Sequence, residues 1–339
     1  MSDRAKGALL GLAVGDALGT TYEFRAIEQP DYPTLATGPA NGVVGGGPFE
    51  LRAGQVTDDT QLAVCLARSL HERGGLDVDD LGRRYVAWAQ HAFDIGAQTR
   101  AAIDRLEDGE PAAVAGIRVW HNSDRRPAGN GSLMRTAPIG VAYAAREPAA
   151  LVDAAIADSL ITHADPKCTI ACAAFDAAIA AAIRTGCDAA GMLDAAHGGV
   201  QAATERLHAA WTDPIDRERI ARAHEDLTGD LAIARGDTPS VYEIVLHLHR
   251  TQGFVRVAFR LAFWHLLHTR SWHDALIDVA SRGGDADTNG AIVGALLGAR
   301  DGATAIPDEW VQRVLGATQP GPDDWAEAHH PRHLLALVA

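Results

Sequence analysis

Helical periodicity runs through most of this chain. Apolar residues recur at spacings of three and four over long segments of the 339-residue sequence, which is typical of helices with one buried face. Runs in which Val, Ile and Thr alternate with polar residues, the signal of half-buried strands, are nearly absent. The pattern predicts an all-α fold. We expect one domain over residues 1–339, although that length exceeds the usual size of a single domain.

Two long loop-like segments and one charged segment interrupt the helical pattern. Residues 30–56 and 120–138 are rich in glycine, proline and small polar residues. Loops of that length inside a compact domain are usually functional. The mixed, charged stretch at 204–240 indicates a solvated helix or an insertion, and it matches no motif that would assign it a role.

Glycine recurs at every fourth position in two segments near opposite ends of the chain. These glycines are Gly7, Gly11, Gly15 and Gly19, then Gly290, Gly294 and Gly298. Each costs a helix about 1 kcal/mol relative to alanine, so the pattern needs a reason. A ridge of glycines lets two helix backbones approach closely. We therefore predict two tightly packed central helices, which would bring Asp16, Glu23 and Asp285 near one another.

Composition excludes one class of partner. The formal net charge is −14, and no Lys/Arg-rich run occurs. Because a nucleic-acid binder needs a basic stripe to neutralise phosphates, we expect no binding to DNA or RNA. An anionic ligand would have to be held by metal ions and backbone amides instead.

The N-terminus and the cysteines favour a cytoplasmic protein. The apolar stretch from Gly7 to Val14 is short, ends at Asp16 and lacks a cleavage-type tail, so it is neither a signal peptide nor a membrane span. The cysteines lie in apolar, alanine-rich surroundings and form no CxxC pair; they are Cys65, Cys168, Cys172 and Cys187. We expect buried, reduced thiols, no membrane association and a monomer.

Two short acidic tracts carry the strongest chemical signal. They are Thr57-Asp58-Asp59-Thr60 and Gly283-Gly284-Asp285-Ala286-Asp287-Thr288. Each begins what reads as a helix, where a single polar residue could be an ordinary N-cap, but a cap does not explain two carboxylates. If the fold brings the tracts together, their oxygens suit a hard cation such as Mg²⁺ or Mn²⁺. Two such ions would neutralise about four carboxylate charges.

Further motifs follow in a fixed order along the chain. They are Gly7-Ala8-Leu9-Leu10-Gly11, Gly15-Asp16-Ala17-Leu18-Gly19, Glu23, Phe93-Asp94-Ile95-Gly96, Gly129-Asn130-Gly131-Ser132-Leu133-Met134-Arg135, Thr162-His163 and Gly253-Phe254-Val255. Together with the acidic tracts they resemble the ADP-ribosylglycohydrolase family, the DraG-like and ARH-like dinuclear hydrolases, over about residues 4–300. The acidic tracts combined with the 129–135 motif are highly specific, whereas any one motif alone is weak.

The resemblance implies a fold, an activity and a metal site. The fold would be a compact, single-domain orthogonal helix bundle. The activity would be metal-dependent hydrolysis of the bond between ADP-ribose and an acceptor, foremost protein arginine. Two Mg²⁺ (or Mn²⁺) ions would be held by Thr57, Asp58, Asp59, Asp285, Asp287 and Thr288. The residues expected to take part in catalysis are Glu23, Asp58, Asp59, Asp94 and Asp287.

Glu23 and Asp94 each have a plainer interpretation. A glutamate after a helix is more often a solvated surface charge, and Asp94 could cap a helix that begins near Ala97. The resemblance instead implies that Glu23 lies at the mouth of the active site and that Asp94 faces the leaving group. A carboxylate there suits a guanidinium, which can donate paired hydrogen bonds to it.

Contacts to ADP-ribose are expected from a glycine-bounded loop and two rings. The loop residues Gly129, Asn130, Gly131 and Ser132 could present N–H groups to phosphates or form an ordinary turn. His163 is expected to contact the ligand, although a lone histidine is more often structural. Phe254 could stack on adenine or belong to the core. For the C-terminal histidines His329, His330 and His333 we expect an exposed tail.

Other functions stay open from the sequence. One is hydrolysis of serine-linked or other O-linked ADP-ribose. Another is a metal-dependent nucleotide phosphohydrolase, which could use the same carboxylates but would release phosphate or AMP. The last is a non-catalytic ADP-ribose-binding relative, against which the intact acidic set with Glu23 argues.

Overall fold

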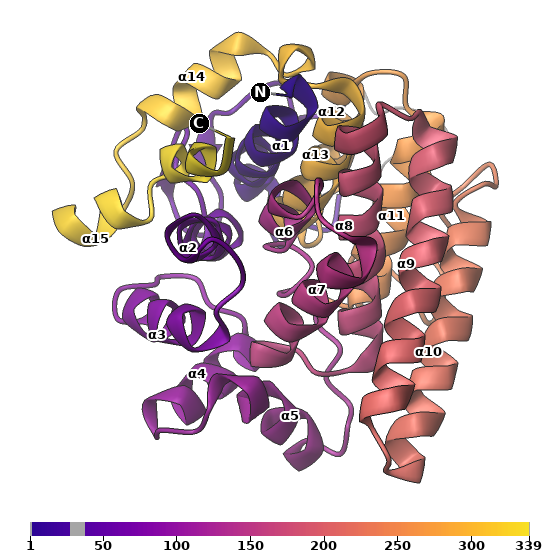
Figure 1. Ribbon diagram of the computed structural model, residues 1–339. Coiled ribbons are helices and arrows are strands. Elements are labelled where there is room, and N and C mark those ends of the chain that lie inside the picture. Colours follow the sequence, from indigo (N-terminus) through magenta and orange to yellow (C-terminus); the bar gives the residue numbers. More distant parts are fainter. Residues whose placement is uncertain (1, 28–37, 339) are drawn as a thin grey trace.

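Helices form nearly all the regular structure of residues 2–27 and 38–338, the part of the chain that the computed structural model describes (Figure 1). The predicted all-α class is confirmed, in a single-domain helix bundle. Within the described residues, the strands are β1 (Gly45–Gly46) and β2 (Leu51–Arg52), a short antiparallel pair. They lie in the loop predicted at 30–56, of which residues 30–37 fall outside the described residues.

Two antiparallel helices, α1 (Asp3–Gly19) and α13 (Ala286–Asp301), pack backbone to backbone. The glycines pair in opposite order along the two helices: Gly7 with Gly298, Gly11 with Gly294, Gly15 with Gly290. A Cβ added at any of these positions would come closer than 3.0 Å to the facing carbonyl. Every residue of α1 from Gly7 to Gly19 is buried. The close packing predicted from the glycine spacing is therefore confirmed.

The other helices surround this pair. On one side of the view in Figure 1 lie α2 (Asp58–Arg73), α3 (Val78–Ala89), α4 (Ala97–Glu107) and α5 (Ala112–Asn122). On the other side lie α7 (Pro148–Thr162), α8 (Pro166–Thr185), α9 (Ala189–Ala210), α10 (Pro214–Ile233) and α11 (Val255–His268). The remaining elements are η1 (Thr20–Tyr22), α6 (Ala137–Ala142), α12 (Trp272–Ser281), η2 (Ala303–Ala305), α14 (Asp308–Gly316), α15 (Asp323–Ala328) and η3 (Pro331–Val338).

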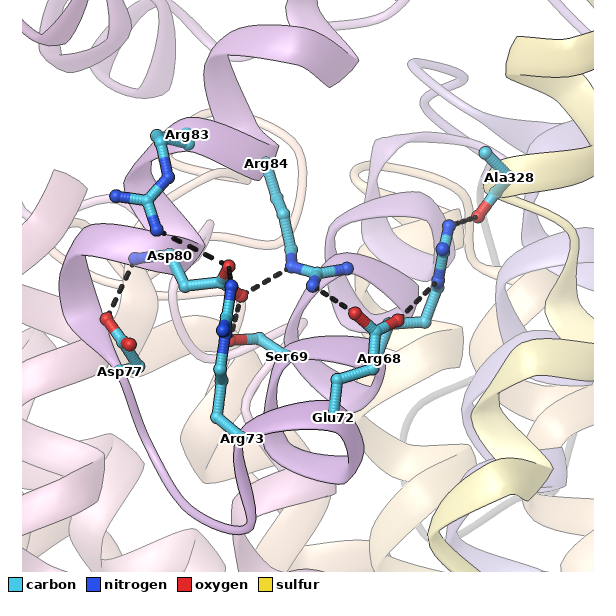
Figure 2. Close-up of polar contacts among 9 residues, drawn as sticks. All are labelled: Arg68, Ser69, Glu72, Arg73, Asp77, Asp80, Arg83, Arg84 and Ala328. Carbon is cyan, nitrogen blue, oxygen red and sulfur yellow. Dashed lines mark hydrogen bonds and ion pairs between the residues drawn. The ribbon is translucent and has the colours of Figure 1, made fainter.

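A polar network joins α2 to α3 (Figure 2). The buried carboxylate of Asp80 accepts hydrogen bonds from Ser69 (2.8 Å), Arg73 (2.6 Å) and Arg84 (2.6 Å). Burial alone would raise the pKa of Asp80, but the hydrogen bonds from the arginines and Ser69 hold it well below its ordinary value. Arg84 also binds Glu72 at 2.6 Å. The network stabilises the corner at which the helix carrying the first acidic tract ends.

The solvated-helix interpretation of 204–240 is wrong for one face of α10. Ile220, Ala223, Leu227 and Leu231 recur at helical spacing and are all fully buried. The same face buries Asp230, which accepts hydrogen bonds from Arg256 (2.7 Å) and Arg260 (2.9 Å) of α11. The many charged residues of the other face hid this apolar stripe in the sequence.

The prediction of an exposed histidine tail is also wrong. His329 and His330 are buried, and each ring bonds a backbone carbonyl: His329 that of Trp325 (2.7 Å) and His330 that of Ala317 (3.1 Å). His333 is half-buried against Glu327. These rings hold the C-terminal segment onto the fold.

Helix α8 is the one described helix long and apolar enough to span a membrane. In the fold, 78% of its apolar window is buried inside the protein, as is usual for a core helix.

Candidate active site

Three helix N-termini meet at one cavity. They belong to α2, α4 and α13, and the cavity has a volume of about 310 Å³. Its lining comprises Glu23, Phe24, Asp58, Asp94, Gly96, Ala97, Gln98, Thr99, Gly129, Asn130, Gly131, Met134, His163, Gln252, Gly253, Asp285, Asp287 and Thr288. Helix N-termini favour negative charge, which helps to explain why acidic side chains gather here. A larger groove of about 550 Å³ between α7, α8 and α9 is lined mostly by alanine, glycine and arginine, and brings together no such set of carboxylates.

The first acidic tract is positioned by a carboxylate of α1. Asp16 is fully buried and accepts hydrogen bonds from the N–H and the hydroxyl of Thr57 (3.1 and 3.0 Å). It also accepts from the N–H (3.1 Å) and hydroxyl (2.5 Å) of Thr60. Thr57 occupies the N-cap position of α2 without making a side-chain cap bond. The threonines therefore tie the tract to α1, and leave Asp58 and Asp59 in the first turn.

The second tract is positioned by Glu23 and by the loop before α6. Glu23 is buried, and its carboxyl accepts hydrogen bonds from the N–H groups of Ala286 (2.6 Å) and Asp287 (3.3 Å). It thus caps α13, whereas Asp285 at the N-cap position makes no side-chain cap bond. The amide of Asn130 donates to Asp285 at 2.6 Å. Glu23 is accordingly a buried neighbour of the second tract, and the surface-charge interpretation does not apply.

Burial raises the pKa of the acidic groups at the cavity. It raises the pKa of Asp94 to about 7, with the charges of Asp287 and Asp285 adding to the effect. Burial likewise raises the pKa of Asp287 to about 7 and of Asp16 to about 6. The pKa values of Glu23, Asp58, Asp59 and Asp285 are raised as well, by burial first of all. So many crowded carboxylates are unfavourable unless protons or cations neutralise them.

The donor set fits a hard divalent cation. Glu23, Asp285 and Asp287 each offer a carboxylate oxygen, and these oxygens all lie within 4.8 Å of one another. In the first tract, Oδ1 of Asp59 is buried without a hydrogen-bond partner in the described structure. A buried carboxylate oxygen left unpaired is costly, and a cation would satisfy it. Carboxylate and hydroxyl oxygens are the ligands that Mg²⁺ and Mn²⁺ prefer.

Asp94 lies on the loop between α3 and α4, at the edge of the cavity. It is half-buried, and its carboxyl is hydrogen-bonded to that of Asp58 and to the backbone of Ile95. Gly96, not Asp94, occupies the N-cap position of α4. The capping interpretation therefore does not apply, and the carboxyl of Asp94 faces the first acidic tract.

The 129–135 loop presents Gly129, Asn130 and Gly131 to the cavity. The N–H of Gly129 donates to Gln98 (3.2 Å), and that of Asn130 donates to the carbonyl of Gly253 (3.0 Å). These two N–H groups are thus used within the protein rather than held ready for a phosphate. The side chain of Ser132 is fully buried and bonded to Ser159 at 2.9 Å, so the structure does not bring its hydroxyl to the cavity.

His163 packs directly on this loop. A Cβ added at Gly131 would come closer than 3.0 Å to the His163 ring, so a larger residue there would displace the ring. Nδ1 of His163 bonds the hydroxyl of Thr162 at 2.8 Å. Burial, helped by the charge of Arg135, lowers the pKa of His163 well below its ordinary value, which keeps the imidazole neutral. Phe254, in contrast, pairs through its backbone with Gly129 and is not part of the cavity lining.

Comparison with known proteins decides the family. The model of the ADP-ribosylglycohydrolase family matches residues 1–337. The chain belongs to this family. The ADP-ribosylarginine hydrolase Tri1 of Pseudomonas putida (strain GB-1) is 31% identical over 321 residues, which cover 92% of this chain and 74% of that relative. The ADP-ribosyl-(dinitrogen reductase) glycohydrolase of Rhodospirillum rubrum is 29% identical over 92% of this chain and 90% of its own.

A solved structure agrees with this assignment. The structure of an ADP-ribosylglycohydrolase-related protein complex superimposes with a TM-score of 0.68 and 29% identity, over 99% of this chain and 96% of that chain. The fold class and the recognition of the family from its motifs are therefore confirmed.

The cavity of this ADP-ribosylglycohydrolase is also lined by residues that the sequence did not single out. These residues are Phe24, Gln98, Thr99 and Gln252. Phe24 directly follows Glu23. Gln98 and Thr99 follow the Phe93–Gly96 motif within one helical turn, and Gln252 precedes Gly253. Proximity to a motif was the available signal, but it does not tell which neighbours turn inward.

Proposed function

We propose that this chain is a metal-dependent ADP-ribosylarginine hydrolase, which frees a protein arginine from ADP-ribose. The observation that carries the proposal is the convergence of both acidic tracts and Asp94 on one cavity. Relatives named for hydrolysis of ADP-ribosylarginine and of ADP-ribosylated dinitrogen reductase support it. Asp94 favours arginine as the acceptor, because a carboxylate matches the hydrogen bonds that a guanidinium donates.

Two Mg²⁺ or Mn²⁺ ions would be held by the tracts, through Thr57, Asp58, Asp59, Asp285, Asp287 and Thr288. Ions bound there would orient the ribose hydroxyls and make water a better nucleophile. The unpartnered Oδ1 of Asp59 supports this assignment, as does the group of oxygens from Glu23, Asp285 and Asp287. Glu23 is proposed to hold the second tract in place through its bonds to the N-terminus of α13.

The ADP-ribose portion would lie along the 129–131 loop. Gly129 and Gly131 lack side chains, so a ligand can approach the backbone next to His163. The neutral His163 can exchange hydrogen bonds with ribose or phosphate oxygens but contributes no positive charge. Asn130 would keep Asp285 oriented toward the sugar through its 2.6 Å hydrogen bond.

Hydrolysis removes one proton from the attacking water and delivers one proton to the departing nitrogen. The water oxygen bonds to the anomeric carbon, the carbon–nitrogen bond breaks, and the departing guanidine nitrogen gains a proton. Asp94, with a pKa raised to about 7, can hold or release a proton near neutral pH. As a carboxylate it would accept hydrogen bonds from the guanidinium, take up the proton that the water loses, and pass a proton to the departing guanidine nitrogen.

The buried free cysteines also support action in a reducing compartment, and we propose a cytoplasmic monomer. Cys65, Cys168 and Cys172 are buried and form no disulfide in the described structure.

One experiment tests the proposal. The chain is incubated with Mg²⁺ and either arginine-linked or serine-linked ADP-ribosyl peptides, and the products are identified by mass. We expect intact ADP-ribose and a preference for the arginine linkage. Asp94→Asn keeps the shape but removes the charge, so it should lower turnover of the arginine substrate while metal content stays normal. Release of AMP would indicate a phosphohydrolase. A preference for the serine linkage would contradict the proposal that Asp94 recognises an arginine acceptor.

A further inference from the structure

Three phenylalanines form an aromatic cluster at one edge of the cavity, in which Phe24 and Phe93 are exposed and Phe49 is half-buried. Phe24 lines the cavity beside Glu23 and is 57% exposed. Its ring packs edge to face on Phe49 at a centroid distance of 6.2 Å, and Phe49 packs in the same way on Phe93 at 5.5 Å. Phe93 directly precedes Asp94. We call Phe24, Phe49 and Phe93 the aromatic rim, and it links the two cavity-lining residues Phe24 and Asp94.

The backbone of Phe24 adopts a conformation that a bulky residue rarely takes. Its φ is +59°, in the left-handed region, where a side chain larger than that of glycine or asparagine is strained. Two hydrogen bonds of 2.7 Å impose this conformation: the N–H of Phe24 donates to the carbonyl of Gly284, and the N–H of Gly284 donates to that of Arg25. Strain of this kind concentrates at functional sites.

Packing alone does not explain a phenylalanine at this position. More than half of the side chain is exposed, so it adds little to the core, and glycine would satisfy the backbone without strain. A large, strained and exposed ring that lines the active-site cavity is better explained by contact with a ligand.

The charges around the ring select the kind of ligand. Glu23, Asp58 and Asp94 line the same cavity, so this end of it attracts a cation. The face of an aromatic ring also attracts a cation that lies within about 6 Å of its centroid. A guanidinium can use both at once, since its flat face stacks on a ring while its N–H groups point in-plane toward a carboxylate. A serine hydroxyl offers neither feature.

We propose that the aromatic rim is the acceptor subsite, and that Phe24 selects guanidinium-linked over hydroxyl-linked ADP-ribose. The proposal rests on the hydrolase function proposed above and adds to it the residue that, with Asp94, recognises the leaving group. Phe24 stacks on the guanidinium, Asp94 accepts its hydrogen bonds, and Phe49 packs edge to face against the Phe24 ring.

The test measures kcat/KM of the full chain with Mg²⁺ for ADP-ribosyl-arginine and for a serine-linked ADP-ribosyl peptide, together with the Kd of free ADP-ribose. For Phe24→Leu we expect kcat/KM on ADP-ribosyl-arginine to fall about 3- to 30-fold, while the Kd of ADP-ribose changes by less than about twofold. Turnover of the serine-linked peptide should be unchanged. Phe24→Trp should keep or improve arginine turnover. Phe49→Leu, which alters a neighbouring ring that does not line the cavity, is the matched control and should have the smaller effect.

A second variant separates ligand binding from a structural role. Phe24→Gly relieves the left-handed backbone, so we expect Tm to stay the same or to rise by about 2 °C while arginine turnover falls. A structural role for the ring predicts a lower Tm instead.

The outcomes distinguish this inference from the function on which it rests. Turnover of ADP-ribosyl-arginine by Phe24→Leu at the wild-type level would overturn the inference and leave the proposed function intact. A loss of ADP-ribose affinity equal to the loss in kcat/KM would also overturn it, because Phe24 would then contact the ADP-ribose portion. Failure of the wild type to cleave ADP-ribosyl-arginine would contradict the proposed function itself, and the acceptor subsite with it.

Discussion

The two acidic tracts differ in how the fold holds them. The first tract is fixed by the carboxylate of Asp16, which accepts hydrogen bonds from the N–H and hydroxyl groups of Thr57 and Thr60. The second tract is held partly by a hydrogen bond between two carboxyl groups, those of Glu23 and Asp287. The contacts of Asp16 are satisfied by hydrogen bonds alone, although Oδ1 of Asp59 in the first tract has no partner in the described structure. The contact between Glu23 and Asp287 in the second tract itself depends on protons or a cation to offset repulsion.

Both anchors nevertheless lie within eight residues of each other in the sequence, at the end of α1 and just after η1. Asp16 lies in α1, and Glu23 follows η1 directly after it. Because α1 packs on α13 without intervening side chains, the position of each tract is tied to the same rigid pair of helices. The comparison shows that one close helix contact can position two distant sequence segments, even where the local means of holding them differ.

The largest expected effect comes from separating that helix pair. A Cβ at Gly15 would collide with the carbonyl of Gly290, and no rotamer change can relieve a backbone contact. We expect Gly15→Ala to destabilise the protein by about 3 kcal/mol or more and to disturb both tracts at once. Thermal unfolding and metal binding are measured together. The matched control is Gly229→Ala in α10, where an added Cβ would meet no neighbouring element within 4 Å and where alanine should stabilise the protein by about 0.5–1 kcal/mol.

A smaller effect, confined to the first acidic tract, is expected when Asp16 is substituted. Asp16→Asn removes an acceptor, and its amide then faces donors of Thr57 or Thr60. We expect metal affinity to fall about 10- to 100-fold, as for other residues that orient metal ligands. Crystal or solution structures should show the first tract displaced and the second unchanged. If both tracts keep their positions and their affinity, Asp16 is not the anchor.

The smallest effect is a pH dependence of the metal-free protein. The pKa values of Asp94 and Asp287 rise from 3.8 to about 7 on folding, so between about pH 4 and pH 7 the native state binds more protons than the unfolded state. Stability supplied by these protons is present at low pH and is lost as pH rises through 7. With metal chelated, Tm at pH 8 should therefore be lower than at pH 6. Mg²⁺ should raise Tm more at pH 8, and a pH-independent metal effect would count against carboxylate ligation.

Features that repeat locally could be predicted from the sequence. The four-residue glycine spacing indicated the α1–α13 contact and the approach of the acidic residues, and doubled carboxylates at helix starts indicated a metal site if the two tracts met. The structure shows the α1–α13 glycine contact, and residues of both tracts line one cavity. These features are visible in the sequence because the residues that meet the requirement, small residues for close packing and carboxylates for a cation, are near one another in the chain.

Features that depend on a distant partner could not be predicted. The sequence around Ser132 does not indicate its hydrogen bond with Ser159. The sequence around His330 does not indicate its hydrogen bond with the carbonyl of Ala317. Likewise, the left-handed backbone of Phe24 is imposed by Gly284, more than two hundred residues away in the chain. Composition also misled at α10, where surface charges outnumber the apolar residues of the buried stripe.

The most direct test of the account is a count of bound metal in three proteins. Mn²⁺ or Mg²⁺ is titrated into the wild type, Asp59→Ala and Asp287→Ala, and turnover is measured on the same samples. We expect about two ions per wild-type chain, and in each variant the loss of an ion and of nearly all activity. An ordinary helix cap would cost only about 1 kcal/mol of stability and no metal. Full metal occupancy with normal turnover in both folded variants would contradict the claim that the two tracts form one metal site.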